Sequence, residues 1–184
     1  MRPSRVFWCV CALSVIAISS GCERQRLKKE MRAFMSREIT LPDGLLEIVS
    51  GRFTVRDYTI EKPTLVFLYG PEECSSCSIE KMVEHSLDMD ALQESGKCAI
   101  LVLFSPEDIQ QYDVLNQLLD VELPFPTYLD MEGNFYNLNE NFPSDIRFHC
   151  FLLGMDGHPI FIGNPLHSLV LHNLFEKSLN TIVE

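Results

Sequence analysis

One stretch of the sequence constrains the fold more than any other: an apolar run, a sharp turn and two cysteines stand directly before a helical pattern. The run Leu65–Tyr69 is continuous and of strand length, which predicts a strand buried on both faces. Gly70-Pro71 ends this strand, and Cys74-Ser75-Ser76-Cys77 follows. Apolar residues then recur at helical spacing as far as Leu87. We therefore expect Cys74 to lie at the start of a helix that runs from position 74 or 75 into the Leu87 region.

The remainder of the chain alternates predicted strands and helices. The run 98–104 predicts a second buried strand, after which Ser105-Pro106 opens a helix with the serine as its cap. One face of this helix is expected to carry Ile109, Tyr112, Leu115, Leu118 and Leu119. A short strand at 127–130 and a hairpin of strands 150–153 and 160–162 come next. A last helix is expected to start at Asn164-Pro165 and to bear Leu166, Val170, Leu174 and Leu179. This order predicts one α/β domain with helices on both faces of a sheet.

The charge of the chain excludes one class of function. The 184 residues carry a formal net charge of −11, which is unevenly distributed. Residues 23–37 hold six basic and two acidic side chains, whereas residues 38–184 hold seven basic and 24 acidic ones. A body with a net charge of −17 repels a polyphosphate backbone, so we expect no nucleic-acid partner.

The first 22 residues are typical of an export signal. Arg2 and Arg5 precede the apolar run Val6–Ile18, which is too short to span a membrane as a helix. Ser19-Ser20-Gly21-Cys22 then resembles the lipobox of bacterial lipoproteins, and the alternative is an ordinary cleaved signal with a coincidental Cys22. The resemblance implies that the first 21 residues are removed and that Cys22 carries lipid, including palmitate. It also implies a membrane-anchored protein that faces the periplasm.

The expected organisation therefore has three parts. Residues 1–22 form the lipoprotein signal peptide with the lipobox Cys22, residues 23–37 form a basic tether, and residues 38–184 form the domain. The tether is either attracted to an anionic lipid surface or is a solvated linker helix.

The two closely spaced cysteines are the candidate reactive groups. Unpaired N–H groups at a helix start favour a thiolate, and two cysteines around one helical turn can close a disulfide. An inert disulfide and half of a zinc site are the alternatives. Cys98 and Cys150 have no informative spacing and are expected to be small buried hydrophobic residues.

In this context Cys74 and Cys77 resemble the active cysteines of the thioredoxin-like superfamily, in particular its extracytoplasmic thiol–disulfide oxidoreductase branch. The stretches 125–133 and 151–157, with Gly163, are similar to that branch up to its final hairpin, and the resemblance extends from Leu41 to the C-terminus. It implies a thioredoxin-like sandwich with a central mixed β-sheet. It also implies that Cys74 attacks a substrate disulfide and that Cys77 resolves the mixed disulfide. The implied partners are protein thiol or disulfide clients and an upstream electron donor, with no cofactor beyond the Cys74–Cys77 disulfide.

Several positions depart from the family pattern. Glu73 replaces the aromatic residue before the first cysteine, and Leu68 replaces a buried acid. With Glu72, Glu73 is expected to raise the pKa of Cys74, which favours work as a reductant or isomerase. The position of the family's cis-proline falls on Phe148 or His149, where a trans peptide is expected.

Phe148 and His149 are therefore candidate residues that modulate the dithiol or face its substrate. The sequence allows three interpretations of His149: an acid–base helper, a metal ligand or a partly exposed loop histidine. The last interpretation is favoured. Three hypotheses for function follow. The leading one is an oxidoreductase without a bound metal. The second is a copper-handling protein that uses Cys74, Cys77 and His149, and the third is a binding module with a static disulfide.

Overall fold

The computed structural model describes residues 23–183, so the predicted signal peptide and Cys22 lie outside the described residues. The chain divides into two compact units, Met1–Ser36 and Arg37–Glu184. In the described part of the first unit, residues 23–35 are helical. This segment carries most of the basic side chains of the predicted tether, and those side chains are exposed.

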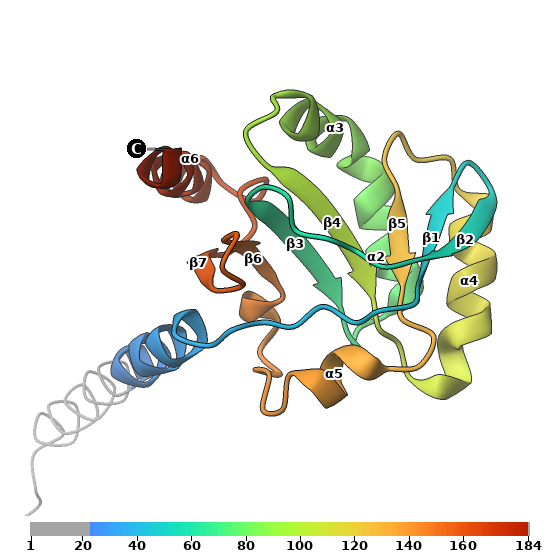
Figure 1. Cartoon of the computed structure of the whole chain (residues 1–184), viewed down its shortest axis with the longest axis horizontal. Coiled ribbons are helices and arrows are strands. Elements are labelled where there is room, and N and C mark those ends of the chain that lie inside the picture. Colours follow the sequence, from blue (N-terminus) through green and yellow to red (C-terminus); the bar gives the residue numbers. More distant parts are fainter. Residues whose placement is uncertain (1–22, 184) are drawn as a thin grey trace, which may run out of the picture. The chain divides into compact units, whose positions relative to one another are not determined.

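The second unit is built on a seven-stranded mixed sheet. Its strands are β1 (Leu45–Val49), β2 (Arg52–Arg56), β3 (Thr64–Tyr69), β4 (Ala99–Phe104), β5 (Thr127–Leu129), β6 (Cys150–Leu153) and β7 (Pro159–Ile162). They lie in the order β2-β1-β5-β4-β3-β6-β7, with β3 and β4 near the centre (Figure 1). β3, β4 and β5 run parallel, and the other neighbouring strands pair antiparallel.

Helices connect these strands. They are α2 (Ser75–Glu84), α3 (Ser86–Glu94), α4 (Gln111–Asp120), α5 (Asn134–Leu138) and α6 (Leu169–Val183), with two short 3₁₀ helices, η1 (Asp108–Gln110) and η2 (Ile146–Phe148). The connections β3–α2–α3–β4 and β4–α4–β5 join parallel neighbours, so both are crossover connections.

Both faces of the sheet are covered. On one face, alternate residues of β3 and β4 join a single apolar core with Met82 of α2, Met89 of α3, Leu118 of α4 and Phe175 of α6. The intervening strand residues are buried as well. On their side of the sheet, Phe142 packs between Phe135 of α5 and Phe151 of β6, with ring centroids 5.1 and 6.1 Å apart. The predicted mixed sheet with helices on both faces is confirmed.

The helix after the cysteines begins as predicted but ends earlier. α2 stops at Glu84, and His85 has φ −97° and ψ 6°, outside the helical region. The Ser86 hydroxyl donates a hydrogen bond to the Val83 carbonyl at 2.8 Å, which competes with helix continuation. Leu87 therefore belongs to α3, a separate helix.

The next helix starts later than the sequence predicts. Ser105 does not cap it, because its hydroxyl donates instead to Asp130 Oδ2 at 3.0 Å in a buried contact. α4 begins only after η1, which turns Ile109 and Tyr112 to solvent with exposed fractions of 84% and 71%. The prediction that these two side chains share one face with Leu115 and Leu118 is wrong, because the latter two are buried and Val114 joins them in the core.

The last helix is also shorter at its start. The Asn164 side chain accepts the Leu166 N–H at 2.9 Å and forms a turn there, so α6 begins at Leu169. Of the apolar residues predicted for this helix, Val170 and Leu174 are exposed and Leu179 is buried, and Phe175 is buried as well.

The hairpin of β1 and β2 was not predicted from the sequence. Ser50 and Gly51 connect its strands, and both have positive φ, 48° and 70°. Two such residues in a row are the pattern of a tight hairpin turn. The Ser-Gly pair was the available signal, but β2 is exposed along its length and shows no apolar alternation into a core.

Candidate functional site

The structure places Cys74 at the junction of the central strand and α2. After β3 the chain makes a turn in which the Glu73 N–H donates to the Gly70 carbonyl at 3.2 Å. Cys74 then caps α2 with an extended backbone, φ −67° and ψ 101°. Its Sγ accepts the Cys77 N–H at 3.4 Å, so the sulfur satisfies one of the free amides of the helix start. Both thiols are exposed.

The environment shifts the pKa values of the two thiols in opposite directions. The pKa of Cys74 is lowered because the Cys77 side chain and the Cys77 N–H both donate hydrogen bonds to its thiolate, with a smaller contribution from the Ser76 N–H. The pKa of Cys77 is raised, chiefly because its hydrogen bond to Cys74 favours the protonated form. Cys74 is thus the thiol poised to ionise first, and Cys77 keeps its proton.

The expected effect of the glutamates before Cys74 is corrected by the structure. The Glu73 carboxylate is engaged by other groups: it accepts the Gly70 N–H at 3.2 Å and contacts His149 Nδ1 at 2.6 Å. Neither Glu72 nor Glu73 is among the groups that raise the pKa of Cys74, and the carboxylate that does so is Glu80 on α2. Glu80 was missed, although its position three residues after Cys77 puts it on the same helical face.

His149 is not the partly exposed loop residue favoured from the sequence. It is 8% exposed, and its Nε2 lies 3.1 Å from the Pro143 carbonyl oxygen. Its own carbonyl accepts the Leu68 N–H at 2.8 Å, which joins it to β3. No spacing in the sequence signals the contact with Glu73, because the two residues are 76 positions apart.

Phe148 lies beside His149 but belongs to the interior. It closes η2 with no exposed surface, so its side chain does not face a substrate at the dithiol. The described chain contains no cis peptide bond, and the backbone here is trans.

A second close contact shapes the turn before Cys74. The Tyr136 hydroxyl lies against Gly70, where an added Cβ would be 2.1 Å from the Tyr136 oxygen. Only glycine fits at this position without displacing the ring. Burial, followed by the charges of Glu73 and Glu72, raises the pKa of Tyr136, so the hydroxyl stays protonated.

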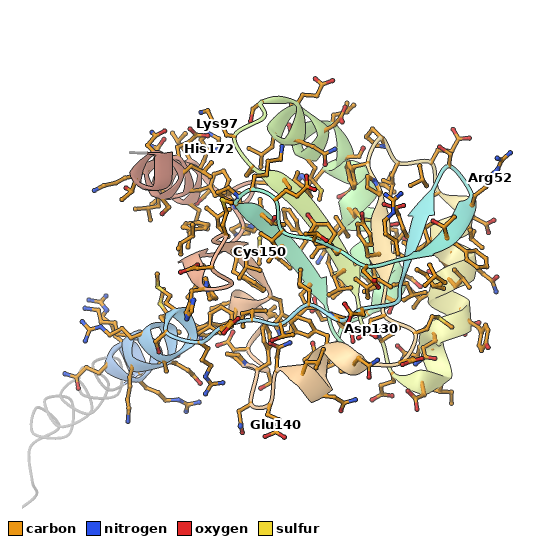
Figure 2. The ribbon with its side chains drawn as sticks, viewed as in Figure 1. Arg52, Lys97, Asp130, Glu140, Cys150 and His172 are labelled. Carbon is orange, nitrogen blue, oxygen red and sulfur yellow. The ribbon has the colours of Figure 1, made fainter. Side chains whose placement is uncertain are left out.

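The other two cysteines of the domain lie in the core, as predicted. Cys98 is completely buried next to β4, and Cys150 starts β6 inside the domain (Figure 2). Burial raises the pKa of Cys98 to about 11 and also raises that of Cys150. Neither thiol is suited to exchange at neutral pH.

The described residues offer no further ligand set. Within residues 23–183, no three side chains of His, Cys, Asp or Glu gather as a metal site would require. Over the same residues, no helix combines the length and apolarity needed to cross a bilayer. The site therefore consists of the two thiols, the helix start that holds them and the turn between β3 and α2.

No family model and no curated protein matches this chain. Several solved structures are similar to it. A putative thiol:disulfide interchange protein DsbE from Chlorobium tepidum is 14% identical, with a TM-score of 0.47 over 78% of this chain and 98% of that one. An uncharacterised thioredoxin-like protein from Porphyromonas gingivalis is 15% identical, with a TM-score of 0.42 over 78% of this chain and 92% of that one.

Copper-bound yeast Sco1 is also similar, at 11% identity and a TM-score of 0.45 over 75% of this chain and 94% of that one. All these identities and TM-scores are low, so the fold is taken from the chain's own strand order, which shows a mixed α/β sandwich of the kind that the resemblance implied. Cys74 lies at the start of the helix after the central strand, as the sequence predicted.

Proposed function

We propose that this protein carries out thiol–disulfide exchange on extracytoplasmic proteins through Cys74 and Cys77. One observation carries the proposal. Cys74 is an exposed thiol at a helix start, and its pKa is lowered by hydrogen bonds from Cys77. A thiolate is the form that attacks disulfides, and a neighbouring protonated thiol is the form that can later resolve the product.

The proposed reaction proceeds in two exchange steps. The Cys74 thiolate attacks one sulfur of a client disulfide, a Cys74–client bond forms, and the other client sulfur leaves as a thiolate. Cys77 then loses its proton to solvent and attacks Cys74 Sγ, which expels the second client thiolate. The client gains two electrons and two protons, and the protein is left with a Cys74–Cys77 disulfide. An upstream dithiol donor must reduce that disulfide before the next cycle.

The direction of exchange is set by the reduction potential. The hypothesis of a reductant or isomerase came from the charges of Glu72 and Glu73, and the orientation of Glu73 removes that argument. Glu80 acts in the same direction, because its charge disfavours the Cys74 thiolate, although the hydrogen bonds from Cys77 outweigh it and lower the pKa of Cys74 overall. We keep work as a reductant or isomerase as the proposal, with a potential nearer the about −270 mV of thioredoxin than the about −120 mV of a strong oxidant.

Equilibration with glutathione buffers of graded potential tests this proposal. We expect Cys74 and Cys77 to pass together from dithiol to disulfide, with a midpoint below about −200 mV. Cys98→Ser is the matched control, because it removes a cysteine that is buried and should leave the midpoint unchanged. A pair that never forms the disulfide would contradict exchange. A pair that stays oxidised in excess dithiothreitol would also contradict it and would favour the binding module with a static disulfide.

The copper-handling alternative would need His149 as a third ligand. His149 already contacts Glu73 and the Pro143 carbonyl through its two ring nitrogens, so metal binding would break one of these contacts. No observation of this site favours that function over exchange.

We also propose that the protein is a lipoprotein anchored through Cys22 and facing the periplasm. The support is the sequence pattern of the first 22 residues, together with the basic charge of residues 23–37.

A further inference from the structure

The contact between Glu73 and His149 joins two segments that are distant in sequence. Glu73 Oε1 and His149 Nδ1 lie 2.6 Å apart, and the two side chains are only 21% and 10% exposed. Glu73 belongs to the turn that presents Cys74, and His149 belongs to the segment that leads into β6. A short, largely buried contact of this kind is stronger than an ion pair at the surface.

The hydrogen-bond partners fix the charge of this pair. His149 Nε2 faces the Pro143 carbonyl oxygen, which can only accept, so Nε2 must carry a hydrogen. One further proton then lies between Nδ1 and Glu73 Oε1. Whether it stays on the imidazole or on the carboxyl group, the pair has no net charge. Glu73, the residue next to Cys74, therefore carries no uncompensated negative charge.

Both partners are held in place by other contacts. The Gly70 N–H donates to the Glu73 carboxylate at 3.2 Å, so the side chain folds back over its own turn. The His149 backbone is bonded to Leu68 of β3, and the Phe142 ring lies 5.7 Å from the imidazole. The pair thus fastens the turn before Cys74 to the central strand from which that turn departs.

The remaining groups around the pair are few. Asp145 faces His149 but is itself paired with Arg147, and Tyr69 and Tyr136 face Glu73 as neutral phenols. Glu73 directly precedes Cys74 in the sequence, so the charge balance of this pair is set one residue away from that thiol.

We propose that Glu73 and His149 are a positioning pair for the dithiol. His149 holds the Glu73 carboxylate away from Cys74 and cancels its charge, which leaves the helix start and Cys77 free to stabilise the thiolate. This inference deepens the proposed function, because it names the residues that tune the same site.

The pH dependence of Cys74 alkylation by iodoacetamide tests the pair in the full-length protein, with each cysteine-containing peptide followed by mass spectrometry. In His149→Phe, the Glu73 charge is uncompensated, and we expect the Cys74 rate at pH 7 to fall about threefold to tenfold. In the double variant Glu73→Gln, His149→Phe, no charge remains, and the rate should return to within about twofold of the wild type. His158→Phe, which removes a half-buried histidine beside Asp156, is the matched control and should leave the Cys74 rate unchanged.

Recovery in the double variant separates charge cancellation from a merely structural role, since a packing defect at position 149 would persist. A wild-type profile in His149→Phe, or a double variant as slow as His149→Phe, would overturn the proposal. If His149→Phe does not fold, His149→Gln supplies the same comparison, because glutamine cannot become a cation. Alkylation needs no client protein, so it tests the pair independently of disulfide exchange. If the variants show the expected alkylation rates but the protein exchanges no disulfides, the proposed function is rejected and the positioning pair stands.

Discussion

The four cysteines of the domain fall into two pairs with opposite chemistry. Cys74 and Cys77 lie exposed at a helix start, whereas Cys98 and Cys150 lie inside the sheet core. Hydrogen bonds lower the pKa of Cys74, while burial raises the pKa of Cys98 to about 11. The same side chain therefore ionises more readily in one place and is kept protonated in the other. The difference comes from solvent and from hydrogen-bond donors at a helix start, since the thiol itself is unchanged.

Removal of the thiol proposed as the nucleophile should have the largest effect. We expect Cys74→Ser to lower the rate of disulfide reduction in a client peptide by at least about a hundredfold, because serine cannot supply a thiolate. Cys98→Ser is the paired control and should retain the wild-type rate in the same assay. An equal loss of rate in both variants would contradict the distinction between a reactive exposed pair and an inert buried pair of cysteines.

A third class of cysteine is proposed at Cys22, which should anchor the protein. Replacement by Ala should move the protein from the membrane fraction to the soluble fraction, because the attached lipid supplies most of the membrane affinity. Fractionation with and without high salt separates lipid anchoring from attraction of residues 23–37 to the surface. Tight membrane association of Cys22→Ala in high salt would show that another element holds the protein there.

The buried pair makes a prediction about stability at high pH. Burial raises the pKa of Cys98 from 9.0 to about 11, so the folded state keeps a proton that the unfolded chain has already lost. The stability linked to this proton is complete below about pH 9 and is lost as the pH rises toward 11. Between these values, the free energy of unfolding should fall by about 1–2 kcal/mol more in the wild type than in Cys98→Ala. Denaturant unfolding at a series of pH values measures the difference, and parallel curves would mean that Cys98 does not titrate differently on folding.

The smallest expected effect concerns the acid that opposes ionisation of Cys74. Glu80→Gln should raise the alkylation rate of Cys74 at neutral pH by less than about threefold, because the charge is at the surface and is screened. Glu84→Gln, one turn further along α2, is the matched control. A decrease in rate on removal of Glu80 would show that its carboxylate supports the thiolate by another route.

The sequence predicted the parts of this molecule that depend on local patterns. The buried runs of β3 and β4 and the start of α2 at Cys74 follow from apolar composition and from a turn that stops a strand. The helix after β4 was misplaced because Ser105 has a distant partner, Asp130, which a local capping pattern cannot reveal.

The candidate site shows the same limit more clearly. The two thiols could be identified from spacing, but the orientation of Glu73 could not, because it depends on a histidine brought close only by the pairing of β6 with β3. The prediction assumed that the Glu73 charge acts on Cys74 because the two residues are adjacent in sequence. In the folded protein the Glu73 carboxylate contacts His149 instead. The acid that does act on Cys74, Glu80, was overlooked although it lies on the same helix.

The capture of mixed disulfides in living cells tests the central claim most directly. In Cys77→Ser, Cys74 can still attack a client but the product cannot be resolved, so client proteins should remain attached to Cys74 and migrate as complexes that dithiothreitol releases. The matched variant Cys74→Ser should capture far fewer, because it lacks the thiol at the helix start that attacks the client. Complexes that appear equally in both variants, or in neither, would contradict the account of Cys74 as the attacking thiolate and Cys77 as the resolving thiol.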